Sequence, residues 1–327
     1  MHPSTHAYQN LRGIVYKKTI GNYVVHTGER VVTCAISPRL RKELIYPTAD
    51  PGSLSHIVRS VSDIKTVDPV AVGDEVSFID TQDGSGMIVE VLPRRNRLAR
   101  MNPGTKKIEQ VIVANLDQVV PIIAAAQPEP KWNLLDRYLV SAESLGLASL
   151  ICITKLDLVD GDMRLLAEVE TYRNIGYPVI LTSAATGLGM DEFRVALRGR
   201  VSVFIGKSGV GKTSLLNSIQ PGLGLRVIEV SQATEKGKHT TTNLTMFPLD
   251  AGGSVVDTPG MREFGLWDVD KDDLALLFPE MRSWVGICRF GLDCTHTLEP
   301  GCAIHRAVEK GQVSERRYQS YLRLREG

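Results

Sequence analysis

Apolar and polar positions alternate in short stretches over the first part of the chain, up to about Leu92. Alternation with a period of two is typical of strands that bury one face. The turn Asp83–Gly86 is predicted to join the last two strands as a hairpin, and Ser37–Asp68 to form a long loop. Five short strands indicate a small barrel, either an OB-fold or an SH3-like barrel. The predicted strands are Gly13–Tyr16, Tyr23–His26, Val31–Ile36, Glu75–Asp80 and Met87–Leu92.

Between Asn115 and Leu266 the pattern changes to strands that alternate with helices. This alternation predicts a doubly wound α/β domain with a parallel sheet. Beyond Asp270 a helical pattern surrounds a cysteine-rich loop and ends in a helix over Ser314–Leu324. The clearest helix is Trp132–Leu145, whose apolar face is expected to carry Leu135, Tyr138, Leu139, Ala142 and Leu145.

A phosphate-binding loop of the form G-x-x-x-x-G-K-T follows the apolar strand Val201–Ile205 and opens a helix that Pro221-Gly222 ends. Glycines let the backbone curl so that consecutive N–H groups point at a polyphosphate. Lys212 is expected to neutralise β- and γ-phosphate charge and to assist catalysis, and Thr213 to bind Mg²⁺. An accidental glycine-rich turn is the alternative, which the strand-loop-helix order disfavours. The expected nucleotide contacts are Gly206, Lys207, Ser208, Gly209, Val210, Gly211, Lys212, Thr213 and Ser214.

A second nucleoside-triphosphatase motif, D-x-x-G, follows the short apolar run Ser254-Val255-Val256. At the end of a strand, Asp257 can hold Mg²⁺ through water and the Gly260 N–H can reach a γ-phosphate. The motif is weak alone, but its position downstream of the phosphate loop strengthens it.

The base is predicted to be guanine, because Thr154-Lys155-Leu156-Asp157 ends the apolar strand Ser149–Ile153 and resembles the N-K-x-D motif of guanine-nucleotide-binding proteins. The Asp157 carboxylate can accept from both N1–H and the N2 amino group of guanine, whereas adenine would leave it unpaired. The Lys155 stem can cover the base. The next strand, Tyr177–Leu181, leads to Ser183-Ala184, whose backbone N–H is expected near guanine O6. A solvated strand-end loop is the alternative.

The motifs occur in a permuted order, since the base-reading loops precede the phosphate loop. The same sheet can form from a circularly permuted chain, because domain termini usually lie at the surface and close together. The segment after Gly260 then runs directly into the C-terminal region, which we expect to respond to the nucleotide state.

Three cysteines and a histidine in the C-terminal region show the spacing C-x5-C-x-H-x5-C. Three thiolates and an imidazole are a closed ligand set typical of structural Zn²⁺. His305 is a competing ligand, but it is expected on the surface of a helix that begins near Cys302. The predicted ligands are Cys288, Cys294, His296 and Cys302. Cys34 and Cys152, isolated in apolar strands, are expected in the core.

Composition adds few constraints to this picture. The chain has 327 residues, 43% hydrophobic residues, five cysteines and a net charge of +1. It contains no apolar run of membrane-spanning length and no signal peptide, so we expect several domains, no disulfides and a cytoplasmic location. Basic residues gather in two places, and such runs, taken alone, are usually solvated faces. They are Arg94, Arg95, Arg97, Arg100, Lys106 and Lys107, and then Arg316, Arg317, Arg323 and Arg325.

These motifs together resemble the RsgA (YjeQ) family of ribosome small-subunit-dependent GTPases. The resemblance rests on the permuted order, Lys238–Thr242, Asp257–Leu266 and the Cys/His knuckle. Two features depart from the family pattern: Thr154 stands where the family usually has Asn, and five residues rather than four separate the first two cysteines.

The resemblance implies a mainly α/β multidomain protein with an OB-fold barrel, a circularly permuted P-loop GTPase domain and a helical zinc-binding domain. The expected boundaries are 1–100 for the RNA-binding barrel, 101–268 for the GTPase domain and 269–327 for the zinc domain. It also implies GTP and GDP as ligands, one Zn²⁺, Mg²⁺ with GTP, and a monomer that binds the small ribosomal subunit and its rRNA, not a membrane. Under the resemblance, the two basic clusters are expected to contact ribosomal RNA rather than to be merely solvated.

The usual side chain that orients the attacking water is missing from its place in the D-x-x-G motif. Many GTPases carry Gln just after the D-x-x-G glycine, and here that residue is Met261. His239 is the candidate catalytic replacement, with a solvated loop histidine as the alternative. Of the threonines Thr240-Thr241-Thr242, Thr241 is predicted to reach Mg²⁺ in the GTP state.

The predicted function is therefore GTP hydrolysis coupled to late maturation of the small ribosomal subunit, with stimulation by that subunit. One alternative is a permuted GTPase of large-subunit assembly. The other is a non-enzymatic RNA-binding zinc protein in which the nucleotide is a structural clamp.

Overall fold

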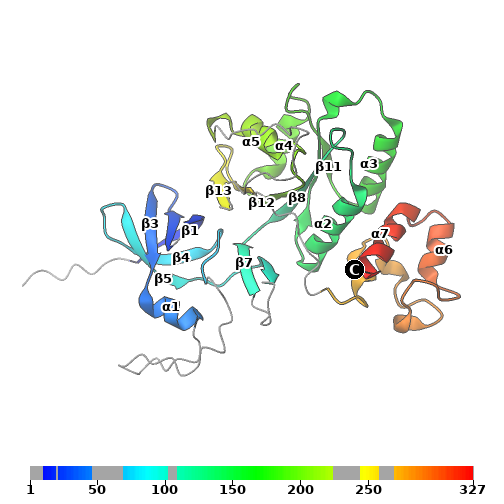
Figure 1. Ribbon diagram of the computed structural model, residues 1–327, viewed down its shortest axis with the longest axis horizontal. Coiled ribbons are helices and arrows are strands. Elements are labelled where there is room, and N and C mark those ends of the chain that lie inside the picture. Colours follow the sequence, from blue (N-terminus) through cyan, green and yellow to red (C-terminus); the bar gives the residue numbers. More distant parts are fainter. Residues whose placement is uncertain are drawn as a thin grey trace, which may run out of the picture. The chain divides into compact units, whose positions relative to one another are not determined.

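The computed structural model describes residues 10–19, 21–45, 69–101, 109–223, 244–257 and 269–326 (Figure 1). These residues form two compact units. The first comprises the described residues within 10–116, 244–248 and 254–257, and the second comprises those within 117–223, 249–253 and 269–326. In the described parts of the chain no helix is long and apolar enough to cross a membrane.

The first unit contains the predicted five-stranded barrel. Its strands hydrogen-bond in the order β1-β2-β3-β5-β4, and β1 also pairs with β4 and closes the barrel. All pairs are antiparallel except β3 with β5. The strands are β1 (Asn10–Thr19), β2 (Asn22–His26), β3 (Val31–Ile36), β4 (Glu75–Asp80) and β5 (Ser85–Val91).

Alternation placed the barrel core correctly. In β3 every second residue is buried, and Cys34 has no exposed surface. Residues from the other strands complete the core, among them Val15, Val25, Val76, Phe78 and Ile88.

Two local details of the barrel differ from the sequence prediction. The expected loop after β3 begins with helix α1 (Pro38–Ile45), because the Ser37 hydroxyl accepts the Leu40 N–H at 3.1 Å and Pro38 suits the first helical position. The hairpin turn lies earlier than expected, because the Asp83 carboxylate accepts the Ser85 N–H at 2.9 Å and β5 already starts there.

Four further strands belong to the first unit. Strands β6 (Arg97–Met101) and β7 (Glu109–Ala114) form an antiparallel ribbon. Strands β13 (Thr245–Pro248) and β14 (Ser254–Asp257) form a second antiparallel pair, and β13 contacts β1 at Lys17.

The second unit contains a parallel sheet with the order β11-β10-β8-β12. Strand β8 is buried along its whole length, as expected for a central parallel strand. The strands are β8 (Gln118–Ala124), β10 (Ile151–Thr154), β11 (Val179–Leu181) and β12 (Val201–Ile205), and the short β9 (Ala148–Ser149) pairs in parallel with the start of β8.

Helices cover both faces of this sheet. Ile123 of β8 packs with residues of α2 and α3, whereas Phe204, in register with the neighbouring Val120, points to the opposite face and contacts Phe193 of α4. The doubly wound architecture is therefore confirmed. The helices are α2 (Trp132–Ser144), α3 (Met163–Ile175), α4 (Met190–Leu197) and α5 (Lys212–Ile219).

The apolar face of α2 is largely as predicted, since Leu135, Tyr138, Leu139 and Ala142 are buried. The prediction that Leu145 belongs to this buried face is wrong, because the helix ends at Ser144 and Leu145 keeps 37% of its surface exposed.

The C-terminal part packs as helices and short turns beside α2, and α7 lies next to α2 in Figure 1. Its core surrounds Phe278, Ile304 and Tyr321. The elements are the 3-10 turns η3 (Leu274–Leu277), η4 (Arg282–Trp284) and η5 (Gly291–Asp293), and the helices α6 (Ala303–Glu309) and α7 (Glu315–Glu326). Strands β8–β12 and helices α2–α5 form the part of the second unit that we call the sheet domain. It also contains two 3-10 turns, η1 (Leu156–Leu158) and η2 (Pro221–Leu223).

Candidate functional site

The phosphate loop connects β12 to α5 at the carboxyl edge of the parallel sheet. Gly206 must be glycine for packing, because a Cβ there would lie 2.4 Å from the Ile122 carbonyl oxygen. Gly209 and Gly211 have φ values of +83° and +92°, which other residues rarely adopt. The local backbone therefore explains why each of these three positions is glycine.

The Lys212 ammonium lies over the loop. It donates to the carbonyl oxygens of Gly206 at 2.5 Å and of Lys207 at 3.0 Å. Thr213 and Ser214 follow in the first turn of α5. The loop therefore presents a cation and a hydroxyl group at a helix N-terminus, which is where a polyphosphate binds.

The Thr154 hydroxyl ties the base-reading loop to the phosphate loop. Its Oγ1 donates to the Val210 carbonyl oxygen at 2.5 Å and lies 3.3 Å from the Ile123 carbonyl oxygen. Thr154 is buried, at 4% exposure. Thr154 stands where the N-K-x-D motif has Asn, and it has a structural role between the two loops that sequence reasoning did not predict.

The predicted base-reading residues come together because β10 and β11 are parallel neighbours, with Ile153 level with Leu181. The Ser183 hydroxyl donates to the Asp157 carboxylate at 2.5 Å and orients it. Lys155, in the left-handed region with φ +58°, donates to the Gln127 carbonyl oxygen. Leu156 begins η1, and Ala184 is half-buried beside Ser183.

The remaining predicted residues of the nucleotide and Mg²⁺ site are Asp257, His239, Thr241 and Gly260. Asp257 is the last residue of β14, in the first unit. His239, Thr241 and Gly260 lie outside the described residues.

The four predicted metal ligands converge, and their ligand atoms all lie within 4.8 Å of one another. The Nδ1 of His296 is 3.5 Å from the Cys288 sulfur and 3.6 Å from the Cys302 sulfur, and these two sulfurs are 3.9 Å apart. With Zn–S of about 2.3 Å and Zn–N of about 2.0–2.1 Å, a tetrahedron requires edges of roughly 3.6 Å and 3.8 Å. The donor set therefore fits Zn²⁺.

Local structure explains how the longer first spacing is accommodated. The 3-10 turn η5 takes up the residues between Cys288 and Cys294, and Gly291 adopts φ +58° within it. Burial lowers the pKa of His296, which keeps its imidazole neutral and able to bind a metal. Burial also raises the pKa of the Cys294 thiol to about 12, and a bound cation would reverse this shift.

His305 lies outside the ligand cluster, as predicted. It sits on α6, and its Nε2 is 2.5 Å from the Tyr318 hydroxyl. That hydroxyl also donates to the His296 carbonyl oxygen at 2.8 Å. Helix α7 therefore supports the knuckle through a tyrosine.

A buried ionic network joins this C-terminal part to the sheet domain. Asp136 of α2 accepts from Arg316 and Arg317 of α7, each at 2.7 Å, and from the Tyr172 hydroxyl at 2.6 Å. Arg317 also pairs with Glu280 at 2.7 Å. The side chains of Asp136 and Arg317 have no exposed surface.

The pKa directions agree with a fully ionised network. Burial alone would raise the pKa of Asp136, but the charges of Arg317 and Arg316, together with hydrogen bonds from Ser320 and Tyr172, outweigh burial and lower it. Arg317 is buried, so the solvated face that such a basic run usually forms is wrong for this residue; its acidic partners are far away in sequence. In the first unit, Arg94 is likewise paired with buried Asp74 at 2.6 Å.

Comparisons with known proteins agree with this geometry. The sequence model of the RsgA GTPase family matches residues 91–267, more than half of the chain. A relative from Gemmatimonas aurantiaca, named small ribosomal subunit biogenesis GTPase RsgA, is 46% identical over 259 residues, which cover 79% of this chain and 84% of the relative.

Two solved structures are similar over nearly the whole chain. YjeQ from Thermotoga maritima has a TM-score of 0.74 and 33% identity, and the match covers 97% of this chain and 98% of YjeQ. YloQ, described as a circularly permuted GTPase, has a TM-score of 0.69 and 29% identity, and the match covers 99% of this chain and 97% of YloQ. Together with the family match, these similarities show that the chain belongs to the RsgA GTPase family and is a circularly permuted GTP hydrolase.

Proposed function

We propose that this chain binds the small ribosomal subunit and hydrolyses GTP to act in late maturation of that subunit. Support comes from the name of the Gemmatimonas aurantiaca relative, a small ribosomal subunit biogenesis GTPase. The observation that carries the GTP part is the meeting of two loops at one sheet edge, where the Thr154 hydroxyl joins base-reading and phosphate loops.

In this proposal Asp157 reads guanine by accepting from its N1–H and N2 amino groups. The hydrogen bond from Ser183 supports this role because it holds one carboxylate oxygen in place. Lys212 neutralises charge on the β- and γ-phosphates, and its present contacts with loop carbonyls keep the ammonium at the loop. Thr213 and Asp257 are the proposed Mg²⁺ ligands, with Thr241 added in the GTP state.

The C-terminal knuckle holds one structural Zn²⁺ in this proposal, through Cys288, Cys294, His296 and Cys302. The ion supplies a closed tetrahedral cross-link and no chemistry at the nucleotide. Tyr318 of α7 donates a hydrogen bond to the backbone of His296, and Arg316 of α7 pairs with Asp136 of α2. The metal would therefore help to hold the C-terminal part against α2.

Three functional parts are proposed along the chain: an OB-fold RNA-binding part at 1–100, the GTPase part at 101–268 and the zinc part at 269–327. The protein acts as a cytoplasmic monomer on the small subunit and its rRNA, with GTP or GDP bound. Nucleotide state reaches the zinc part through the segment after Gly260, which the permuted order connects directly to it.

Hydrolysis depends on the ribosomal partner, because Met261 cannot orient the attacking water. We assign His239 as the internal group that positions this water once the small subunit has bound. A group that acts mainly in the transition state changes turnover more than GTP affinity.

Turnover of GTP with and without purified small subunits tests the proposal. We expect free-enzyme turnover well below the ~10 s⁻¹ of a typical enzyme and a clear stimulation by small subunits. Lys212→Ala should abolish the stimulated rate, and His239→Ala should lower it with little change in GTP affinity. Equal binding of the GTP and GDP forms to subunits, with turnover indifferent to them, would contradict the proposal. A normal rate in His239→Ala would remove only the role of that residue.

A further inference from the structure

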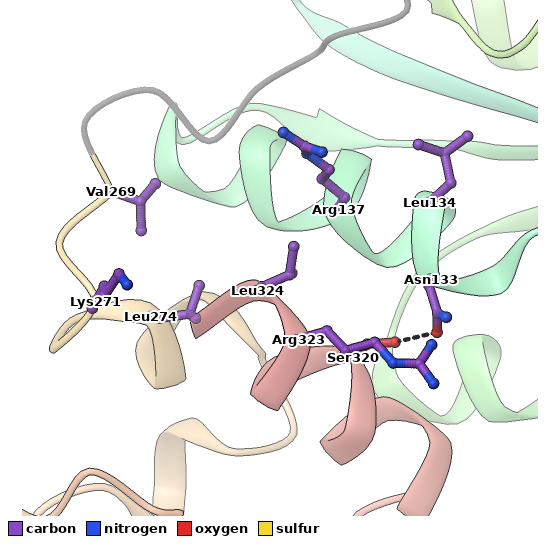
Figure 2. A pocket seen from close by; sticks show the side chains of 9 residues that line it. All are labelled: Asn133, Leu134, Arg137, Val269, Lys271, Leu274, Ser320, Arg323 and Leu324. Atoms are coloured by element: carbon purple, nitrogen blue, oxygen red, sulfur yellow. Dashed lines mark hydrogen bonds between the residues drawn. The ribbon is translucent and has the colours of Figure 1, made fainter. Parts of the chain in front are cut away.

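A concave surface lies between α2, the start of η3 and α7, all within the second unit (Figure 2). It consists of two adjoining pockets of about 480 Å³ and 570 Å³, which share Asn133, Leu134 and Arg323. We refer to this surface as the α2–α7 groove. None of its lining residues belongs to the candidate nucleotide loops or to the zinc ligands.

All charged side chains that line the α2–α7 groove are cationic, although the whole chain has a net charge of only +1. They come from different elements and surround the groove, and Figure 2 shows three of them on α2, before η3 and on α7. The five cations are Lys131, Arg137, Lys271, Arg316 and Arg323.

Three of these cations are not neutralised by an acidic side chain among the described residues. Arg137, Lys271 and Arg323 are exposed and form no ion pair with any described residue. Arg316, by contrast, is held by Asp136 and Glu168. The groove therefore concentrates positive charge that folding of the described chain does not use.

The polar groups between the cations are donors or can act as donors. Ser320 Oγ and Asn133 Oδ1 are 2.9 Å apart, so the Asn133 amide oxygen is engaged and its NH₂ group remains available (Figure 2). The Trp132 ring lies under the Arg316 guanidinium, 5.8 Å from its centroid. This cation–π contact places a further positive charge beside the indole, which suits contacts with phosphates.

We propose that the α2–α7 groove binds the phosphodiester backbone of ribosomal RNA. Exposed cations spread over two adjoining pockets suit a repeated phosphate, whereas one small anion would need an enclosed site. The choice of RNA among polyanions rests on the proposed function. Recognition is by charge and is independent of base sequence.

The test compares two matched variants of the full, zinc-loaded chain. The groove variant carries Arg137→Gln, Lys271→Gln and Arg323→Gln. The control variant carries Arg164→Gln, Arg198→Gln and Lys310→Gln, which remove the same charges from exposed positions elsewhere in the second unit. Co-sedimentation with purified small subunits and filter binding to deproteinised small-subunit rRNA are measured from 50 to 300 mM salt. GTP turnover without subunits should be equal in all three proteins.

We expect the groove variant to bind both probes roughly tenfold more weakly at 0.1 M salt for each cation that contacts a phosphate. The slope of log K against log salt should fall by about 1 per contact, while the control variant keeps the wild-type slope. If wild type fails to bind subunits, the proposed function fails, and rRNA binding still tests the groove.

Two results would overturn the proposal. In the first, the groove and control variants bind rRNA with the same affinity and slope. In the second, the groove variant loses affinity for subunits but not for deproteinised rRNA, which would identify a ribosomal protein as the occupant. Either result leaves the GTPase activity and subunit binding of the wild type intact as separate findings.

Discussion

The ionic network around Asp136 leads to a quantitative prediction about stability. Asp136→Asn keeps the shape of the side chain but removes the charge that two guanidinium groups share. The introduced amide would accept from one arginine and place its NH₂ group against the other donors. Arg317, with no exposed surface, would keep only Glu280 as a charged partner.

The magnitude follows from that burial. Removing one partner of a buried ion pair costs about 3–5 kcal/mol when the remaining charge is left without compensation. Because Glu280 still pairs with Arg317 and Glu168 with Arg316, we take the lower end of this range, about 3 kcal/mol. For a folding unit of 150–250 residues each kcal/mol shifts the melting temperature by about 2–4 °C. We therefore expect Asp136→Asn to lower the melting temperature of the second unit by roughly 6–12 °C.

Differential scanning calorimetry of the full, zinc-loaded chain measures this shift. Asp191→Asn is the matched control, because Asp191 pairs with Arg194 at 2.5 Å but is 98% exposed. Exposed pairs contribute little, so this control should melt within about 1–2 °C of the wild type. If Asp136→Asn also melts within that range, the network does not hold the C-terminal part to the sheet domain.

The pH dependence of this effect has a defined sign. The folded pKa of Asp136 is depressed, so its contribution to stability is fully present above the unfolded-state pKa of about 4. That contribution is lost as the pH falls from there through the folded pKa. The stability difference between wild type and Asp136→Asn, from denaturant unfolding, should therefore shrink at acid pH.

Two further predictions concern the candidate sites. Asp157→Asn should weaken GTP binding and shift preference towards xanthine nucleotides, whose O2 can accept from an amide; equal competition by ATP and GTP in the wild type would end the guanine assignment. Purified protein should contain about one Zn²⁺ per chain by elemental analysis, and Cys294→Ala should lose it and destabilise the C-terminal part. His296→Ala should lose zinc while His305→Ala keeps it, and the reverse result would show that the ligand set is wrong.

Contiguous motifs could be predicted because their chemistry is local. The phosphate loop from Gly206 to Thr213 depends on backbone conformation that its own glycines permit. The four zinc ligands lie close together in the sequence, so one short segment brings them together, and α7 supports it through Tyr318. The same holds for the barrel strands and the apolar face of α2, where burial follows a period of two or 3.6 residues.

Tertiary structure decided what depends on residues far apart in the chain. Nothing near Asp136 or Arg317 predicts burial, since each is buried only because the other arrives from a distant helix to neutralise it. Thr154 lacks the amide of the base motif, yet its hydroxyl joins two loops because β10 and β12 flank β8. The α2–α7 groove likewise depends on tertiary structure, because Arg137 and Arg323 line one pocket only when α2 and α7 pack together. Sequence patterns specify local conformation and chemistry, whereas the partner of a charge depends on which helices pack together.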